Sequence, residues 1–193
     1  MKIGIFGGTF NPIHIGHAII ANYVIQHCGI DRLWLMVSPL NPFKEAQGEC
    51  HNAHRLRMVD MVTRRIDNVE TSGFEFTLPR PSYTIDTLNA LHKKFPEHEF
   101  SLVIGADNWA AFHQWNRYEE ILQHYPILIY PRHGYDIHVP EELKNAVRII
   151  DAPIVEVSSS EIREGIARMD NMSFYLPHDV YSYILRNKLY VYE

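Results

Sequence analysis

The chain has 193 residues, of which 46% are hydrophobic and 21% charged, and its formal net charge is −5. This length and balance indicate one globular domain and exclude a disordered chain. Because the net charge is negative and no long run of lysine or arginine occurs, we expect no nucleic-acid partner.

The cysteines and the apolar runs limit where the chain can work. Cys28 and Cys50 form no CxxC pair and could make at most one disulfide, which favours a reducing compartment. The apolar run at residues 1–6 ends at two glycines and is too short for a secretory signal. No window approaches ~20 consecutive apolar residues. We therefore expect a cytoplasmic protein with no membrane partner.

Apolar stretches and helical patterns alternate along the chain. The patterns predict strands at 2–6, 32–38, within 68–76, and at 99–105, 126–130, 147–150 and 154–157. They predict helices at 15–28, 52–66, 83–95, 107–113, 118–124, 159–169 and 177–187. This alternation is typical of a parallel sheet with helices on both faces. The sequence thus predicts a single α/β domain over 1–193, Rossmann-like and doubly wound, with a small helical portion at its C-terminal end.

The loops that follow the predicted strands are the candidate binding loops. In open parallel sheets, ligands bind beyond the carboxyl ends of the strands. The loops after residues 6, 38, 105 and 130 carry unusual polar or glycine content, and those at 39–51 and 132–140 are long for a compact domain. We expect an active site where these loops meet.

The first of these loops has the features of a phosphate site. Gly7 and Gly8 permit a tight turn and a close approach of the backbone to a ligand. The helix that follows offers the positive end of its dipole, and His14 and His17 lie within one turn on one face. Gly16 between them leaves room for a phosphate. The loop matches neither GxGxxG nor GxxxxGK[ST], so dinucleotide and Walker-type binding are not indicated.

Five sequence blocks, in this order, resemble those of one enzyme family. They are GGTFNPIHIGH at 7–17, SYTIDTL at 82–88, GADNWAAFHQW at 105–115, VSSSEIR at 157–163 and YLPHDVYSYI at 175–184. The first contains the HxGH signature of a nucleotidyltransferase superfamily, whose relatives include the class I aminoacyl-tRNA synthetases. Together the blocks are similar to those of the bacterial nicotinate-nucleotide adenylyltransferases.

The resemblance implies adenylyl transfer from ATP to nicotinate mononucleotide, giving nicotinate adenine dinucleotide and pyrophosphate in NAD biosynthesis. It implies catalytic roles for His14, His17 and Arg163. It implies an ATP site made of Gly7, Gly8, Thr9, Phe10, His17, Gly105, Asp107, Ser159, Ser160 and Arg163. It implies a mononucleotide site made of Lys44, Tyr83, Thr84, Asp107, Trp115 and Arg132.

One block departs from the family pattern. A Pro-His-Lys-like element usually follows the second strand, whereas here the sequence reads Asn41-Pro42-Phe43-Lys44. Lys44 keeps the family's residue and a plausible place beside the acceptor phosphate. The role of the missing histidine is in doubt, because Phe43 cannot hydrogen-bond.

Several site residues also have purely structural interpretations. Residues 82–84 and 158–160 fit helix caps, and Asp107 could cap the helix that follows the strand at 99–105. Trp109 and Trp115 could be core aromatics, and Arg132 could be a solvated surface residue. The remaining histidines and both cysteines show no ligand-like grouping, so we expect no zinc site.

The expected chemistry explains why no nucleophile–base pair stands out in the sequence. A phosphate monoester acceptor is largely anionic at pH 7, because its second pKa is about 6. Catalysis then consists of positioning and charge stabilisation. Mg²⁺ would enter with ATP, whose oxygens and water supply most of its ligands.

Three alternatives remain open from the sequence. The acceptor could be nicotinamide mononucleotide or another phosphate-bearing molecule, although the blocks at 82–88 and 105–115 argue against pantetheine phosphate. The chain could instead be a non-catalytic nucleotide sensor, or a tRNA-binding fragment. Retention of both histidines and Arg163 argues for catalysis, and net acidity argues against tRNA. The sequence leaves open whether the chain forms a homo-oligomer.

Overall fold

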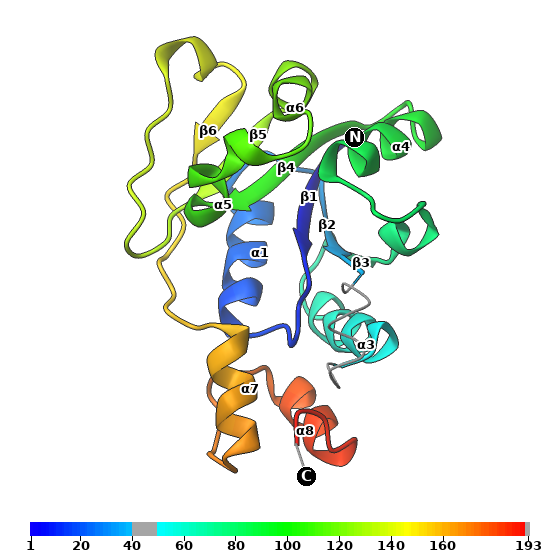
Figure 1. Cartoon of the computed structure of the whole chain (residues 1–193), viewed down its shortest axis with the longest axis vertical. Helices are drawn as coiled ribbons and strands as arrows, with labels where there is room; N and C mark the ends of the chain where they lie inside the picture. The colour runs from blue at the N-terminus through cyan, green and yellow to red at the C-terminus, as the bar shows by residue number, and fades with distance from the viewer. Residues whose placement is uncertain (40–49, 192–193) are drawn as a thin grey trace.

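The computed structural model describes residues 1–39 and 50–191 and contains the parallel sheet that the sequence predicts (Figure 1). Six strands lie in the order β3-β2-β1-β4-β5-β6, and every neighbouring pair is parallel. Their bounds are β1 Lys2–Gly8, β2 Arg32–Val37, β3 Val69–Ser72, β4 Glu99–Gly105, β5 Ile127–Tyr130 and β6 Val147–Ile149. The order changes direction between β1 and β4, which makes this the switch point of a doubly wound sheet.

The helices follow the predicted segments with small shifts at their ends. They are α1 Ile15–His27, α3 Asn52–Thr63, α4 Thr84–Lys94, α5 Ala106–Ala110, α6 Tyr118–His124, α7 Ser159–Ala167 and α8 His178–Arg186. Short 3₁₀ turns lie at η1 Phe74–Thr77, η2 Phe112–Gln114 and η3 Glu141–Leu143. The fold therefore confirms the predicted alternation of strands and helices.

Two local predictions were wrong. The segment 154–157 is not a strand but extended chain without ladder partners between β6 and α7, and Ile154 in it is 55% exposed. Two of its apolar residues, Val155 and Val157, line the site described below. The helix predicted at 107–113 divides into α5 and η2, because the backbone of Ala111 leaves helical geometry (φ −101°, ψ 6°).

The alternating side chains of the strands form two cores, one on each face of the sheet. In β1, Ile3 and Ile5 pack on the face covered by α4 and α6, whereas Phe6 packs on the opposite face with α1 and α3. α7 and α8 belong to the second of these cores and lie at one end of the molecule, with α8 next to α3 (Figure 1). They form the predicted C-terminal helical portion.

Among the described residues, no helix combines the length and the apolar character that crossing a membrane requires.

Candidate active site

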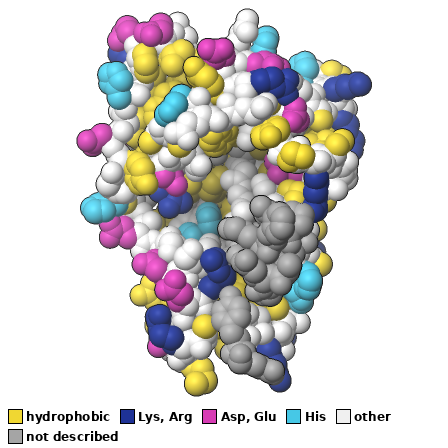
Figure 2. All heavy atoms as spheres, in the orientation of Figure 1, with side chains coloured by type: hydrophobic (Ala, Val, Ile, Leu, Met, Phe, Trp, Pro, Cys, Tyr) yellow, Lys and Arg dark blue, Asp and Glu magenta, His cyan; other side chains and the backbone are white. Residues whose placement is uncertain are grey.

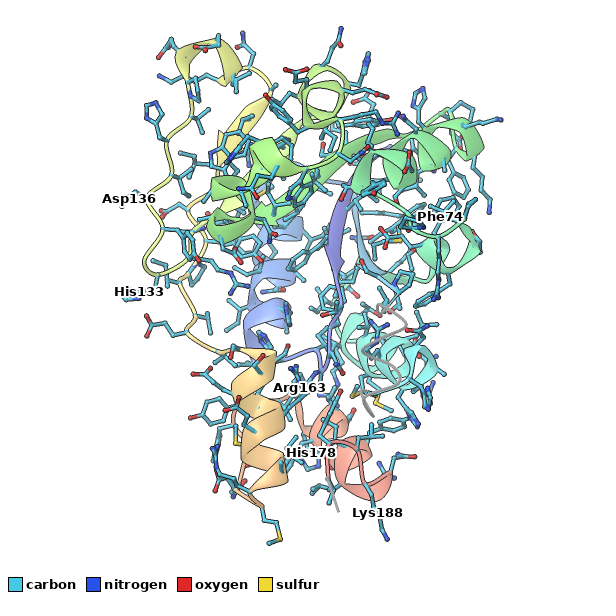
Figure 3. All side chains as sticks on the ribbon, viewed as in Figure 1. Phe74, His133, Asp136, Arg163, His178 and Lys188 are labelled. Atoms are coloured by element: carbon cyan, nitrogen blue, oxygen red, sulfur yellow. The ribbon has the colours of Figure 1, made fainter. Side chains whose placement is uncertain are left out.

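The loop between β1 and α1 lies at the carboxyl end of the central strands. Figure 2 shows the surface on this side of the molecule, which is hollowed near its middle. The backbone carbonyls of the loop accept hydrogen bonds from α7. Ser159 Oγ donates to Pro12 O over 2.9 Å, and Arg163 Nη1 donates to Asn11 O over 2.8 Å. Figure 3 shows the Arg163 side chain directed from α7 toward the middle of the molecule. Residues 7–17 and the start of α7 therefore form one structural unit.

The serines at the start of α7 have different tasks. Ser158 is the N-cap: its Oγ accepts from Glu161 N, and Glu161 Oε2 accepts from Ser158 N. Ser160 Oγ accepts from Arg163 Nη2 at 3.3 Å. The capping interpretation thus holds for Ser158, while Ser159 and Ser160 are tied to the loop and to Arg163.

His14 and His17 form a stacked pair at the start of α1. Their ring centroids are 3.7 Å apart, with 29° between the ring planes. The backbone N–H of His14 donates to His17 Nδ1 over 3.3 Å. Because Nδ1 accepts this bond, a neutral His17 carries its proton on Nε2. His17 therefore offers Nε2–H as a donor to a ligand.

Both imidazoles are neutral near pH 7. Burial, helped by the charge of Arg132 and opposed by that of Glu161, lowers the pKa of His14 to about 4. Burial also holds the pKa of His17 well below its usual value, with further lowering by His14 and Arg132. Desolvation disfavours the charged form of histidine, which explains the direction of both shifts. The two imidazoles can therefore donate hydrogen bonds to a ligand without adding positive charge to the site.

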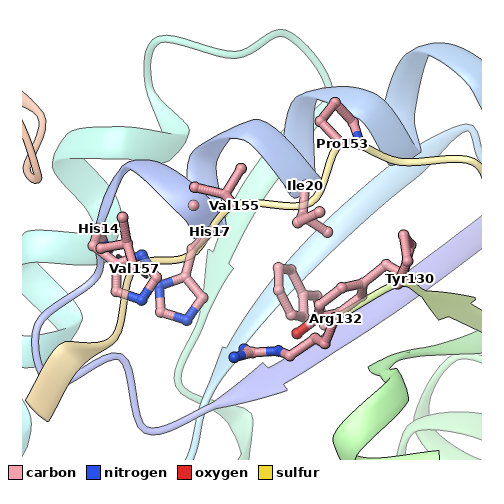
Figure 4. A pocket seen from close by; sticks show the side chains of 11 residues that line it. His14, His17, Ile20, Tyr130, Arg132, Pro153, Val155 and Val157 are labelled. Carbon is pink, nitrogen blue, oxygen red and sulfur yellow. Dashed lines mark hydrogen bonds between the residues drawn. The ribbon is translucent and has the colours of Figure 1, made fainter. Parts of the chain in front are cut away.

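A narrow pocket lies beside this pair (Figure 4). Its walls are apolar and aromatic, from Phe6, Ile20, Tyr130 and Val155, and the imidazoles lie at one end. A Cβ at Gly16 would come within 3.1 Å of the His14 ring and 3.5 Å of Val155. This glycine therefore keeps the pocket open beside the histidines, as its place in the sequence led us to expect.

The predicted residues from the loops after β4 and β5 meet at the same place. Asp107 Oδ1 lies 3.3 Å from Arg132 Nε, and both side chains are only about one-third exposed. A Cβ at Gly105 would lie 2.3 Å from Asp107 Oδ1 and 3.1 Å from Arg132 Nε. The pair therefore requires a glycine at the end of β4. Arg132 is not the solvated surface residue of the structural alternative.

A second cleft opens on the other side of Phe6 and Tyr130, whose rings line both spaces and meet edge to face at 5.7 Å. It is lined by Gly7, Gly8, Thr9, Ser38, Glu75, Thr84, Thr87, Gly105 and Trp115, among others. Two clefts that share one aromatic wall suit two substrates that react with each other.

The start of α4 contributes less than its sequence suggested. Thr84 lines the second cleft, but Tyr83 does not, and the Tyr83 side chain is 47% exposed. The N–H of Tyr83 already donates to Asp86 Oδ2 over 3.2 Å. Trp115 does line the cleft, while Trp109 packs on Phe112 and donates to His138 O.

Sequence reasoning overlooked Arg55 in α3. Its side chain is fully buried and donates to the carbonyls of Thr9 and Ser38, the latter over 2.8 Å. It thereby ties the loop after β1 to the loop after β2. A signal was present: Arg55 stands at the first position of the i, i+3, i+4, i+7 stripe that continues with Met58, Val59 and Val62, all buried. An arginine on an apolar stripe needs buried acceptors.

Lys44 and the departure at Phe43 lie outside the described residues. Among the residues that are described, no group of three or more His, Cys, Asp or Glu side chains could hold a metal ion.

Comparison with known proteins gives the family. The cytidylyltransferase-like family model matches residues 5–165. A relative from Flavobacterium johnsoniae, named as a probable nicotinate-nucleotide adenylyltransferase, is 44% identical over 98% of this chain and 99% of its own length. One from Bacteroides fragilis with the same name is also 44% identical, over 96% and 92%. The chain belongs to the nicotinate-nucleotide adenylyltransferase family. It is thus a nucleotidyltransferase, as its sequence blocks led us to expect.

Solved structures share the fold of this adenylyltransferase. The Plasmodium falciparum nicotinic acid mononucleotide adenylyltransferase, solved in complexes with APC and with NaAD, superposes with a TM-score of 0.81. The two chains are 19% identical, and the match covers 98% of this chain and 96% of that one in the APC complex. This likeness establishes a shared Rossmann-like architecture.

Proposed function

We propose that this chain transfers the adenylyl group of ATP to nicotinate mononucleotide, releasing pyrophosphate, as a step of NAD biosynthesis. The observation that carries the proposal is the neutral, stacked His14–His17 pair, which lies at a helix start and lines the first of two clefts that share Phe6 and Tyr130. Helix starts favour phosphate, and a buried neutral donor stabilises charge that develops during transfer. Both cysteines are free and buried, which supports a cytoplasmic location.

In the proposed arrangement, ATP occupies the pocket beside the histidines together with the adjoining cleft lined by Asp107, Arg132 and Ser158, and the mononucleotide occupies the second cleft. His17 Nε2–H and His14 donate to the ATP phosphates, and Arg163 with Ser159 and Ser160 hold the leaving phosphates. The acceptor phosphate attacks the α-phosphorus in line, and the bond to the β-phosphate oxygen breaks. No general base is needed, because the acceptor is already anionic.

Residues at the rims of the clefts complete the proposed sites. Gly7, Gly8 and Thr9 line the second cleft, so with Phe10 their backbone groups would reach ATP where its phosphates meet the acceptor. Gly105, in the same cleft, would admit the nucleotide beside Asp107. Asp107 and Arg132, which pair with each other, would bind ribose hydroxyls and phosphate of the two substrates. Lys44 would lie near the acceptor phosphate. Trp115 would stack near the nicotinate ring, in the cleft that it lines.

Mg²⁺ would enter as its ATP complex. Its preferred ligands are oxygens, and it keeps several waters, so ATP can supply most of them. Among the described residues, no group of three or more carboxylate, histidine or cysteine side chains could hold the ion, which fits ligands drawn from ATP and water. The ion would supply charge neutralisation of the triphosphate. The chain's own residues bind and orient the phosphates.

The choice of acid over amide rests on the start of α4. The N–H of Tyr83 already donates to Asp86, so it is not the donor for the nicotinate carboxylate. The first backbone donor of α4 that could bind this carboxylate is the N–H of Thr84, which lines the second cleft. An amide NH₂ facing that donor would leave it unpaired, which costs about 1–3 kcal/mol. We therefore expect kcat/KM to be roughly ten- to hundredfold higher for nicotinate mononucleotide than for nicotinamide mononucleotide.

The test is product formation by the purified chain with ATP, Mg²⁺ and either mononucleotide, in the absence of RNA. We expect nicotinate adenine dinucleotide and pyrophosphate in equal amounts. Thr84→Pro should narrow the preference between acid and amide, because proline lacks the N–H yet is well tolerated at the first helical position, which Thr84 occupies. Thr84→Ala, which keeps the N–H, is the matched control.

The outcomes separate the candidate functions. Equal kcat/KM for both mononucleotides would overturn the acid preference and leave adenylyl transfer in place. Tight ATP binding without pyrophosphate release from any mononucleotide would favour the nucleotide sensor.

A further inference from the structure

The loop between β1 and α1, residues 9–14, is hydrogen-bonded by a residue near the other end of the chain. Tyr190 follows α8 and lies 179 positions after Asn11. Its hydroxyl donates to Asn11 Oδ1 over 2.8 Å, and the two side chains are 6% and 3% exposed. A contact of this separation and burial joins the last described turn of the chain to the first loop of the sheet.

The turn that carries Tyr190 is itself fixed to α8. Lys188 N donates to Leu185 O, and Leu189 N donates to Ile184 O. Lys188 and Tyr190 both have positive φ, at 52° and 63°, which side-chain-bearing residues rarely adopt. With this backbone conformation, the Tyr190 side chain reaches Asn11 of the loop.

Asn11 is held at two points by two different elements. Tyr190 binds its side chain, and Arg163 Nη1 binds its carbonyl. The next residue, Pro12, has its carbonyl bound by Ser159. His14 follows two residues later, and its N–H sets the tautomer of His17. A shift of Asn11 would therefore move both catalytic imidazoles.

We propose that Tyr190 is a positioning residue for adenylyl transfer, acting through Asn11 on the placement of His14 and His17. Tyr190 lines neither of the two clefts, so it does not bind substrate itself. Its hydroxyl remains a donor at every working pH, because burial raises the pKa of Tyr190 far above its usual range. The inference rests on the proposed function of the histidine pair.

The test is Tyr190→Phe, which removes one hydroxyl and keeps the ring. The matched control is Tyr183→Phe in α8, whose hydroxyl makes a 2.8 Å hydrogen bond to His54 Nδ1 of α3 and not to a residue of the loop. A misplacement of about 1 Å in a reacting assembly can cost 10²-fold in rate. We expect Tyr190→Phe to lower kcat roughly tenfold with KM values changed less than twofold. Tyr183→Phe should keep kcat while losing a similar amount of thermal stability.

Two further measurements separate positioning from loss of structure. Imidazole ¹⁵N shifts should report a single His17 tautomer in the unmodified chain and in Tyr183→Phe, and a mixture in Tyr190→Phe. Asn11→Ala should lower kcat, and the double variant Asn11→Ala/Tyr190→Phe should lower it no further, because the two residues act through one bond.

The proposal is overturned if Tyr190→Phe keeps kcat within twofold, or if Tyr183→Phe lowers kcat equally. Both results presuppose an active unmodified chain. Absence of product from that chain would instead refute the proposed function.

Discussion

The starts of α1 and α7 face the same loop but differ in charge. α7 begins with Ser158 and Glu161 bound to each other, so a carboxylate already lies at the positive end of its dipole. α1 has no acidic residue in its first turn and begins with two neutral histidines. The start of α4 resembles that of α7, since Asp86 binds the N–H of Tyr83.

The difference indicates where an external anion is best accommodated. A carboxylate at the third helical position stabilises its own helix and weakens the attraction of that helix end for a phosphate. At α1 the dipole is left for the ligand. α7 contributes mainly through side chains, Ser159 and Arg163, that hold the loop in front of α1. The three predictions below test whether α1 binds the phosphates while α7 mainly holds the loop.

The largest effect is expected at the start of α1. His17→Ala removes the donor on Nε2, and the loss of one strong donor to developing charge costs about 10²-fold or more in kcat. His27→Ala, an exposed histidine at the other end of α1, is the control. Steady-state kinetics on both variants, with circular dichroism to check folding, decides the assignment. A folded His17→Ala variant with near-normal kcat would remove His17 from catalysis.

The next effect concerns pH and stability. The pKa of His14 is about 4 in the folded chain and 6.5 in the unfolded chain. As the pH falls from 7 to 5, the unfolded chain gains a proton that the folded chain does not, so stability is lost. His14 alone should lower the free energy of unfolding by roughly 2 kcal/mol over this range.

Urea unfolding of the unmodified chain and of His14→Asn at pH 7 and pH 5 measures this contribution. Asparagine does not titrate and is a favoured N-cap residue, so the variant should fold. We expect it to lose less stability than the unmodified chain between the two pH values. Equal losses in both chains would show that His14 is not buried as a neutral group.

The smallest effect compares α7 with α4. Glu161→Gln keeps the reciprocal cap, because glutamine serves there too, but removes the charge. We expect KM for ATP to fall about two- to fivefold, the equivalent of 0.3–1 kcal/mol of dipole and charge interaction. Asp86→Asn, the same change at α4, should leave KM for ATP unaltered and lower that for nicotinate mononucleotide. An unchanged KM for ATP in Glu161→Gln would mean that the phosphates do not approach α7.

Local pattern was enough to predict most of the fold. Buried strands read as apolar runs, and helices as apolar stripes, because each element buries a continuous face. The site followed from the same logic, since parallel strands end at one edge and bring the loops of Gly8, Gly105 and Arg132 together. The segment 154–157 was wrongly predicted as a strand because two of its apolar residues, Val155 and Val157, line the pocket beside the histidines instead of packing in a sheet.

The contacts behind the loop could not be predicted in this way. The apolar stripe of α3 indicates that Arg55 is buried but not which groups it binds, and Tyr190 is one aromatic residue among many. What gives them their roles is a carbonyl or an amide oxygen reached only after folding. The spacing of residues in the sequence does not indicate a hydrogen-bond partner that lies 179 positions away.

That separation has a consequence for synthesis. A ribosome adds about 5–20 residues per second, so Asn11 is made on the order of ten seconds or more before the tyrosine that holds its side chain. During that interval β1 can pair with β2 and then with β4, but the loop lacks its support from α7 and from Tyr190. The first loop to be translated is thus among the last to be completed, and a partly translated chain has the sheet without a finished phosphate site.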